Sequence, residues 1–475
     1  MTDLHYLSAT DALKAFRARA LSPVELLQAV IDRTEAVDGT VNALCHRFFD
    51  QAMVQAKEAE ARYMGNGDEP RPLEGIPLAV KEEEAVEGQP WTQGSLIYKD
   101  AIAPHSSPFA ERMIESGAII HARSTAPEFS CAGFTHSRLW GATRNPWNPE
   151  YAVGGSSGGS GAALAAGTAT LASGSDIGGS IRIPASYNGV VGFKPPYGRV
   201  PQDAPFNYDT FCHVGPMART VADCALYENA LAGPHPRDHV SVRPKVVLPD
   251  GFAPIDGLRI AVSCDLGSWR VEPEVRANTL AIADALRQAG AVVEEIDLTI
   301  DRDAVNRLAA IHFNLIFAAA VDSEIAEHGD VMTDYALEFP RWTKEAAGDT
   351  GLLEEFVLQA QVCEPLGAVL DRFDVLICPT VASTGLLAGE SYVGKSVTID
   401  GVEMERYFDT MMTIPFNIAS RCPVLAVPSG FASNGVPTGV QLVGRSYDDE
   451  TVFRVGAALD RVRPLYESAA GRPGL

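Results

Sequence analysis

The sequence predicts an α/β fold in which one large domain is built around a central mixed β-sheet flanked by helices. Short apolar runs at 76–80, 119–122 and 375–378 contain β-branched residues and have the length of strands buried on both faces. Residues 258–296 have the pattern of a strand, a helix and a second strand. Alternation of this kind is typical of a parallel or mixed sheet covered by helices. Because no internal repeat divides the sequence, we expect one domain over residues 1–475.

Residues 1–70 are expected to form a helical N-terminal cover. The segment SPVE at 22–25 combines a capping box with proline at the first helical position, and apolar residues then recur at helical spacing over 26–31. A charged helix is predicted from Phe49 to Met64. These helices are expected to cover the core rather than to act in catalysis.

The later elements follow in chain order. Gly75 leads into the strand at 76–80, and Lys81 comes at the end of that strand. A second capping box, Thr220 to Asp223, opens a helix that reaches about Leu231. The remaining predictions are a helix over 107–116, a mostly helical region over 300–372, strands at 424–427 and 438–443, and a last helix from Glu450.

The charge balance restricts the kinds of partner. With 61 acidic against 38 basic side chains, the formal net charge is −23. That field repels phosphate backbones and anionic membranes, so we expect neither nucleic acid nor a membrane as a partner. The N-terminus lacks the pattern of a secretory signal, and no charge-free apolar run reaches the roughly 18 residues of a membrane span. These features predict a cytoplasmic protein.

Cysteine and histidine spacing gives no sign of a metal site. The eight cysteines are scattered without a C-x-x-C pair, which is typical of buried thiols in a reducing compartment. The ten histidines form no H-E-x-x-H or H-x-x-H pair. We therefore expect neither a metal nor any other cofactor.

Two glycine- and serine-rich segments stand out, GGSSGGSG at 154–161 and DIGGSIRIP at 176–184. Glycines of this kind let the backbone turn sharply and expose N–H groups, which suits an anion or an oxyanion. No lysine follows them as a Walker phosphate loop would require, so a nucleotide site is not indicated. Gly154-x-Ser156-x-Gly158 fits the nucleophile elbow of α/β-hydrolases, and a flexible connector is a further alternative. The apolar flanks at 162–172 and 181–191 argue against a connector.

A third interpretation rests on resemblance. GGSSGGSGAALAAG at 154–167 and SDIGGSIRIPASYNGVVGFKP at 175–195 resemble the signature of the amidase signature family, serine hydrolases that cleave amides with a Ser-Ser-Lys triad. GIPLAVK at 75–81 stands where that family keeps its lysine. Lys81 lies 75 residues before Ser156, and Ser156 lies 24 residues before Ser180, as in the family. The resemblance is strongest over residues 75–232, the expected catalytic core, and it implies the family's α/β fold.

The resemblance also implies the roles of the catalytic residues. Ser180 would be the nucleophile, Ser156 the bridging serine after a cis peptide bond, and Lys81 the base. To accept a proton, Lys81 must be neutral, whereas a free lysine has a pKa of about 10.4. We therefore expect a rate profile that favours alkaline pH.

Further residues are assigned by the same resemblance. The backbone N–H groups of Ile177, Gly178, Gly179 and Ser180 would form an oxyanion hole, where a side chain on either glycine would crowd the substrate carbonyl. Ser175, Asp176 and Arg182 would support the site, with Ser175 a hydrogen-bond partner for Ser156 and Arg182 paired with carboxylates. The expected substrate-binding residues are Phe129, Ser130, Cys131, Ala132 and Gly133, of which Cys131 is the one cysteine expected to face substrate. Glu82 departs from the aspartate that the family usually has after its lysine.

Some roles stay open at the level of sequence. Apart from the resemblance, Lys81 could equally be a lysine in a salt bridge with Glu82, Glu83 or Glu84. The family's segment at 300–372 varies and often lies over the pocket. Apolar side chains there could be core or could face substrate: Phe313, Ile316, Phe317, Phe339 and Trp342.

The sequence thus predicts an amide hydrolase that forms an acyl-enzyme and acts on a small-molecule amide. Esters and carbamates (urethanes) pass through similar tetrahedral states, so the sequence does not separate these substrates. The alternatives are an amidotransferase subunit that works with a partner on charged tRNA, and a binding protein without activity. Because N-terminal helices help family members to dimerise, a homodimer is also possible under the resemblance.

Overall fold

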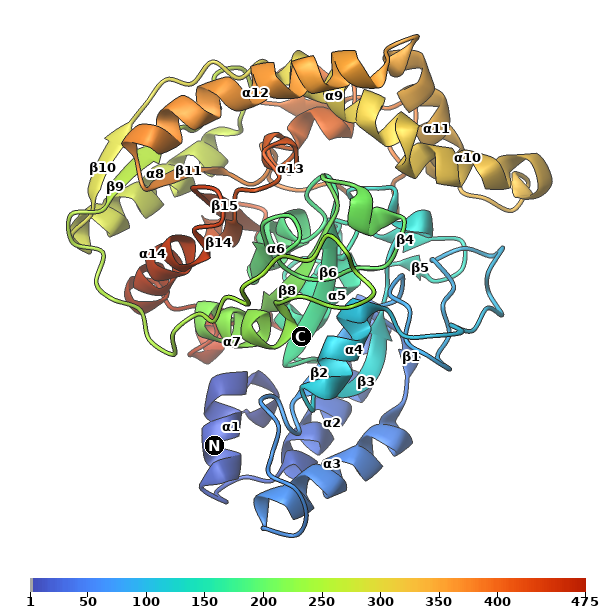
Figure 1. Cartoon of the computed structure of the whole chain (residues 1–475), viewed down its shortest axis with the longest axis vertical. Helices are drawn as coiled ribbons and strands as arrows, with labels where there is room; N and C mark the ends of the chain where they lie inside the picture. The colour runs from blue at the N-terminus through green and yellow to red at the C-terminus, as the bar shows by residue number, and fades with distance from the viewer. Residues whose placement is uncertain (1–2) are drawn as a thin grey trace.

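Eleven strands pair into one sheet at the centre of the molecule, in a computed structural model that describes residues 3–475 (Figure 1). Met1 and Thr2, the first residues of the predicted domain, lie outside the described residues. In chain order the strands are β1 (Leu44–Arg47), β2 (Pro77–Lys81), β3 (Ile119–Ser124), β6 (Leu171–Asp176), β7 (Val191–Lys194), β8 (His213–Ala218), β9 (Arg259–Val262), β10 (Val292–Glu295), β11 (Val375–Pro379), β14 (Val424–Phe431) and β15 (Pro437–Gly444). Across the sheet the order is β1-β3-β2-β6-β8-β7-β14-β15-β11-β9-β10.

The sheet is mixed, which confirms the predicted fold class. β2 runs parallel to both of its neighbours, β3 and β6, and β9 runs parallel to β10 and β11. The other neighbouring pairs are antiparallel. Since carboxyl ends of parallel strands meet at one edge, Lys81 at the end of β2 and Asp176 at the end of β6 come close together.

Helices flank the sheet and cover both ends of the molecule. Figure 1 shows α1 to α3 at the lower end, coloured blue, and α9 to α12 at the upper end, coloured yellow to orange. Their bounds are α1 (Ala9–Arg17), α2 (Pro23–Val41), α3 (Phe49–Tyr63), α4 (Pro108–Glu115), α5 (Gly158–Ala166), α6 (Arg182–Asn188), α7 (Val221–Leu231), α8 (Pro273–Gln288), α9 (Arg302–Leu315), α10 (Phe317–His328), α11 (Asp334–Ala347), α12 (Leu352–Arg372), α13 (Pro415–Ile418) and α14 (Asp449–Val462). Two short hairpins complete the fold, β4 (His136–Ser137) with β5 (Gly141–Ala142) and β12 (Val397–Ile399) with β13 (Val402–Met404).

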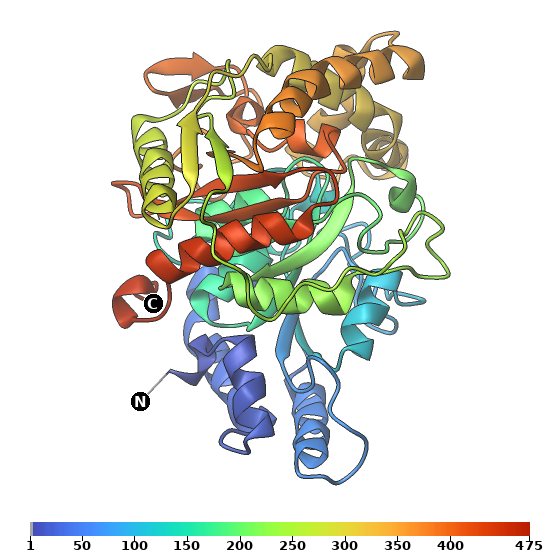
Figure 2. The ribbon, with the colours of Figure 1, turned by 60° about the vertical axis from the view of Figure 1, so that its left-hand side comes forward.

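The two faces of β2 pack against different helices. Leu78 and Val80 belong to an apolar cluster with side chains of α7 and α14, which lie side by side across the sheet in Figure 2. Ala79, which points the other way, packs in a second cluster with the alanines of α5. This confirms the predicted strand buried on both faces, and it explains why the run carries no polar residue before Lys81.

Two local predictions need correction. The predicted helical cover contains a strand, β1, which pairs antiparallel with β3 and was missed because four residues are too short for a clear alternation. The capping box at Ser22 is present, but the one predicted at Thr220 is only half formed. The Thr220 side chain accepts from the N–H of Asp223, whereas the Asp223 carboxylate accepts at 2.9 Å from the N–H groups of Ala9 and Thr10. Asp223 therefore ties α7 to α1.

Long apolar helices are scarce over residues 3–475. No helix taken singly combines the length and the apolar character of a membrane span, and only α9 and α10 taken together, with a bend of 55° between them, have both.

Candidate active site

Lys81 lies inside the protein, with its side chain only 1 % exposed. Its Nζ atom is 2.7 Å from Ser156 Oγ and 2.8 Å from Ser175 Oγ. β2 and β6 bring these groups together, because Lys81 ends one strand and Ser175 comes one residue before the end of its parallel neighbour. The hydrogen-bond partner that the structure gives Ser175 is thus the lysine, and not Ser156 as the sequence suggested.

An acidic neighbour also contacts the lysine. Glu83 Oε1 lies 2.9 Å from Lys81 Nζ, and the Glu83 side chain is 18 % exposed. Burial alone would raise the pKa of Glu83, but the charge of Lys81 and hydrogen bonds outweigh it, so the pKa lies below its usual value. Glu83 is therefore ionised near neutral pH. The open choice between a salt-bridged lysine and a lysine bonded to serine is resolved, because Lys81 does both.

The glutamate that replaces the family's aspartate points elsewhere. The buried Glu82 carboxylate accepts from the backbone N–H and the hydroxyl of Thr92, from the N–H of Gly94 and, at 3.3 Å, from the indole of Trp140. Glu82 thus holds the loop at 92–94 against the end of β2. It supports the position of the site from below and leaves the lysine to its other partners.

The two glycine- and serine-rich segments meet beside Lys81. The peptide bond between Gly155 and Ser156 is cis, and the N–H of Ser157 donates to the carbonyl oxygen of Ser180 at 3.2 Å. α5 begins directly after the first segment and α6 directly after the second. Loop and an isolated bridge precede Ser156, so the strand that a nucleophile elbow requires is not in place.

The carbonyl groups of the Ser180 loop are tied back into the protein. Gly178 O accepts from Thr413 Oγ1 at 2.5 Å, and Gly179 O accepts from the N–H of Ile183 at 2.7 Å. Over residues 3–475, no protein acceptor is recorded for the backbone N–H groups of Ile177 to Ser180. Four adjacent N–H groups without an acceptor can bind an oxyanion.

Gly179 is the glycine that this loop requires. Its φ is +129°, and a Cβ there would lie 2.2 Å from Thr413 Oγ1. At Gly178 a Cβ would meet only Phe313, at an ordinary 3.4 Å. Within the protein itself, the crowding predicted for both glycines therefore applies to Gly179.

Asp176 and Arg182 support the loop from below. Both side chains are fully buried, and the Arg182 guanidinium donates to both oxygens of Asp176. Arg182 holds the pKa of Asp176 well below its usual range despite burial. The sequence analysis missed the remaining partners of this network, which are Thr413, Asn417 and Gln441.

Comparison with known proteins assigns the chain to a family. The family profile described as Amidase matches residues 25–453. The chain belongs to the amidase family. Among its relatives are a glutamyl-tRNA(Gln) amidotransferase subunit of Thermosynechococcus vestitus, 34% identical over 94% of this chain and 96% of the relative, and an acylamidase of Rhodococcus erythropolis, 33% identical over 97% and 96%. A crystal structure of a bacterial aryl acylamidase of the amidase signature family superposes with a TM-score of 0.90 at 29% identity, covering 99% of both chains. The amidase is thus an enzyme of a family that acts on C–N amide bonds.

In this amidase two cavities adjoin the serines. Ser180 lies in the wall of a 40 Å³ cavity that also includes Ser130 to Gly133, four of the five residues predicted to bind substrate. The fifth, Phe129, lines a 330 Å³ cavity together with Ser156 and Ser175. The segment is held by Glu128, whose carboxylate accepts at 2.6 Å from Ser95 and from Thr333. Of the apolar side chains left open at 300–372, Phe313, Phe317 and Phe339 line the smaller cavity.

The amidase's thiols and histidines are poor candidates for the nucleophile and its base. Cys131 lines the smaller cavity, but Cys212 also lines the larger one, so the prediction of a single exposed cysteine was wrong. Burial raises the pKa of both thiols, which keeps them protonated. Burial lowers the pKa of His213 to about 3, and its ring nitrogens contact backbone carbonyls and Lys194. Across residues 3–475 no cluster of three metal-ligating side chains occurs.

Proposed function

We propose that this amidase hydrolyses a small-molecule amide through an acyl-enzyme on Ser180, with Ser156 and Lys81 moving the proton. The observation that carries the proposal is the 2.7 Å contact between Lys81 Nζ and Ser156 Oγ inside the protein. A serine hydroxyl is a weak nucleophile until a base takes its proton, and a neutral lysine can serve as that base.

In acylation, Ser180 Oγ attacks the amide carbon while its proton passes to Ser156 Oγ and the proton of Ser156 passes to neutral Lys81. The tetrahedral intermediate carries its negative charge on the former carbonyl oxygen. When the C–N bond breaks, the proton returns from Lys81 through Ser156 to the leaving nitrogen. A water molecule then attacks the ester on Ser180 by the same route, which releases the acid and restores the enzyme.

The N–H groups of Ile177, Gly178, Gly179 and Ser180 would stabilise the oxyanion. Such donors act best when they are fixed in advance, since no reorganisation is then needed as charge develops. Thr413 and the Asp176–Arg182 pair supply that rigidity, because they hold the loop from the side opposite the N–H groups.

The acyl side of the substrate is proposed to be apolar or aromatic. The cavity at Ser180 adjoins a cavity of 430 Å³, because Cys131, Phe339, Tyr407 and Phe408 line both. Apolar walls of this kind favour apolar groups over charged ones. Esters and carbamates with such an acyl group would pass through the same intermediate, so we include them among the proposed substrates.

A second candidate function is that of an amidotransferase subunit, which the similarity to the glutamyl-tRNA(Gln) amidotransferase relative favours. The net charge of −23 opposes direct contact with tRNA, and we rank this function below the first. Free amide turnover by the purified chain, without ATP, tRNA or a second protein, separates the two functions.

The test of the proposal is a panel of aryl and alkyl amides, esters and carbamates incubated with the purified chain. We expect turnover of at least one amide, and loss of nearly all of it in Ser180→Ala and in Lys81→Ala variants whose circular dichroism is unchanged. No turnover across the panel by the folded protein would contradict the proposal.

A further inference from the structure

The 330 Å³ cavity lies on the side of the serines from which a leaving amine must receive its proton. Ser156 and Ser175 line this cavity, whereas Ser180 lines the smaller one. In the proposed mechanism the proton reaches the leaving nitrogen from Ser156. The amine half of the substrate therefore faces the larger cavity, and the acyl half faces the smaller.

Every formally charged side chain in the wall of the larger cavity is acidic: Glu83, Glu84 and Asp203. Asp203 has cationic partners at the rim, His105 at 3.1 Å and Arg237 at 3.8 Å. Burial raises the pKa of Glu84 to about 7, and its carboxylate accepts from Ser107. Glu83 differs from both, because it is ionised near neutral pH and its cationic partner is Lys81.

This pairing conflicts with the proton transfer unless a second cation is present. Lys81 must be neutral to accept a proton, and a neutral amine leaves the Glu83 carboxylate without a counter-charge in a site that is largely closed to water. An uncompensated buried carboxylate is unfavourable by several kcal/mol. A positive charge brought by the substrate into the cavity would compensate Glu83 and at the same time favour the neutral form of Lys81.

The other walls of the cavity also suit a cation. Trp91, Phe129, Phe206 and Phe317 line it, and aromatic faces attract an ammonium group. Trp91 is fixed next to Glu83, because its indole N–H donates to the Glu83 carbonyl oxygen at 2.6 Å. A carboxylate beside an aromatic wall recognises an alkylammonium through charge and through the apolar chain that carries it.

We infer that Glu83 is a specificity-determining residue that selects substrates whose leaving amine carries a second, ammonium group, such as amides of short diamines. This inference rests on the proposed function and names the amine half of its substrate. Glu83 contacts the reacting lysine as well, so its effect on substrate choice has to be separated from its effect on the rate.

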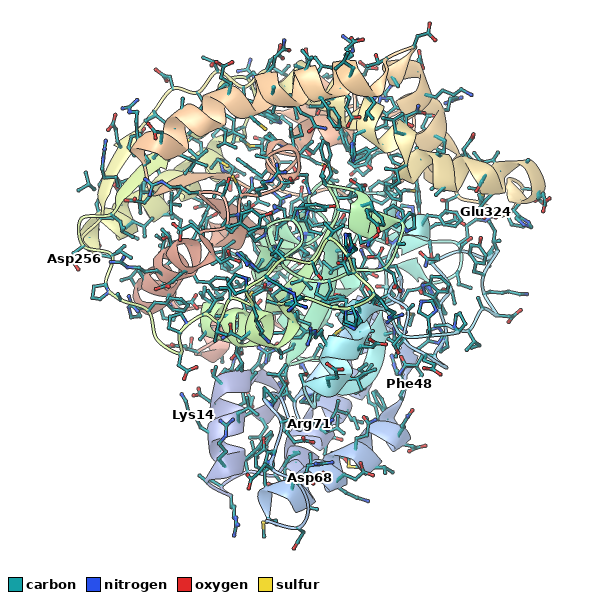
Figure 3. All side chains as sticks on the ribbon, viewed as in Figure 1. Lys14, Phe48, Asp68, Arg71, Asp256 and Glu324 are labelled. Atoms are coloured by element: carbon teal, nitrogen blue, oxygen red, sulfur yellow. The ribbon has the colours of Figure 1, made fainter. Side chains whose placement is uncertain are left out.

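The experiment compares two substrates of equal shape, N-butanoyl-1,4-diaminobutane and N-pentylbutanamide, in which a methyl group replaces the ammonium. At one fixed pH near neutrality, kcat/KM for the charged amide is expected to exceed that for the neutral amide at least about tenfold. Glu83→Gln is expected to bring this ratio close to one, and Glu83→Asp to retain part of it. The matched control is Asp68→Asn, which removes one charge from a side chain that is 92% exposed at the lower end of the molecule (Figure 3) and should leave the ratio unchanged.

The failures of this experiment are distinguishable. If the wild type hydrolyses the neutral amide as well as the charged one, Glu83 does not select a cation and the inference is overturned, while the hydrolase proposal stands. The inference is also overturned if Glu83→Gln slows both substrates by the same factor, because Glu83 then acts only on Lys81. If the folded wild type hydrolyses neither amide nor any member of the wider panel, the proposed function itself is contradicted.

Discussion

Arg182 and Asp176 form a two-pronged ion pair with no solvent exposure, directly beneath the loop that carries Ser180. The guanidinium donates from Nε at 2.9 Å and from Nη2 at 2.8 Å to the two carboxylate oxygens. Its remaining donors reach Thr413, Gln441 and Asn417, which come from the last quarter of the chain. One side chain thus joins the catalytic loop to the C-terminal half of the sheet.

Removing one member of this pair should destabilise the protein strongly, since it leaves a buried charge without a partner. We expect Arg182→Met to lower the free energy of unfolding by about 3–5 kcal/mol, measured by chemical denaturation. Lys14→Met is the control, because Lys14 pairs with Asp11 on the surface with 74% and 60% of the two side chains exposed, and its loss should have an effect of less than about 1 kcal/mol. Equal effects of the two changes would refute the structural role of Arg182.

Gly179→Ala should inactivate the enzyme more than Gly178→Ala. The new methyl group at 179 would collide with Thr413 and would require a strained φ, so the N–H groups of the loop would move. Displacement of one oxyanion donor typically lowers kcat by about 10² to 10³. The measurement is kcat on one amide for both variants at matched folding. If the two variants lost activity equally, the crowding would come from the substrate rather than from Thr413.

A buried histidine predicts how stability depends on pH. His312 on α9 lies 2.6 Å from Asp209 and 2.5 Å from Glu355 on α12. Burial alone would lower the pKa of His312, but the two carboxylates raise it to about 9. Because the folded pKa is above the unfolded value of about 6.5, the stabilisation is complete below pH 6.5 and disappears as the pH rises through 9.

The test of this ion triad is the melting temperature of the wild type and of His312→Gln from pH 6 to pH 10. The wild type should be the more stable at low pH, by on the order of 3 kcal/mol, and the difference should shrink above pH 9. A difference that stays constant over this range would show that the imidazolium charge is not what stabilises the contact between α9 and α12.

Cys131→Ser should retain amide turnover within a few-fold. The thiol lines the cavity at Ser180, but burial raises its pKa and its Sγ donates to the Glu128 carbonyl oxygen at 3.2 Å. It should also react slowly with iodoacetamide, because the thiolate is the reactive form. Loss of turnover in a folded Cys131→Ser variant would make the cysteine a candidate nucleophile and would contradict the assignment to Ser180.

Most of the fold could be predicted from the sequence, because its signals are local. The strand before Lys81 is a short apolar run after a glycine, and the helix at Ser22 has its capping residues in adjacent positions. Family and fold class followed from three separated motifs in the right order, and the comparisons confirm both. Local signals fail where a side chain has a distant alternative partner, as Asp223 does with α1.

The partners within the site could not be predicted from sequence. Glu82, Glu83 and Glu84 are identical neighbours, yet their carboxylates reach Thr92, Lys81 and Ser107 respectively. The chain turns directly after β2, so neither strand nor helix periodicity fixes where these side chains point. The partners of Arg182 lie more than 200 residues away, and Asn417 and Gln441 belonged to segments noted only as family-like.

The most direct test of the central claim is the position of the covalent adduct that a fluorophosphonate forms with the purified enzyme. Peptide mass spectrometry should find one modified residue, Ser180, and Lys81→Ala should slow the labelling by about the same factor as amide turnover, because one base activates the hydroxyl in both reactions. An adduct on Ser156 or another residue, or labelling of Ser180 at an undiminished rate without Lys81, would contradict the account.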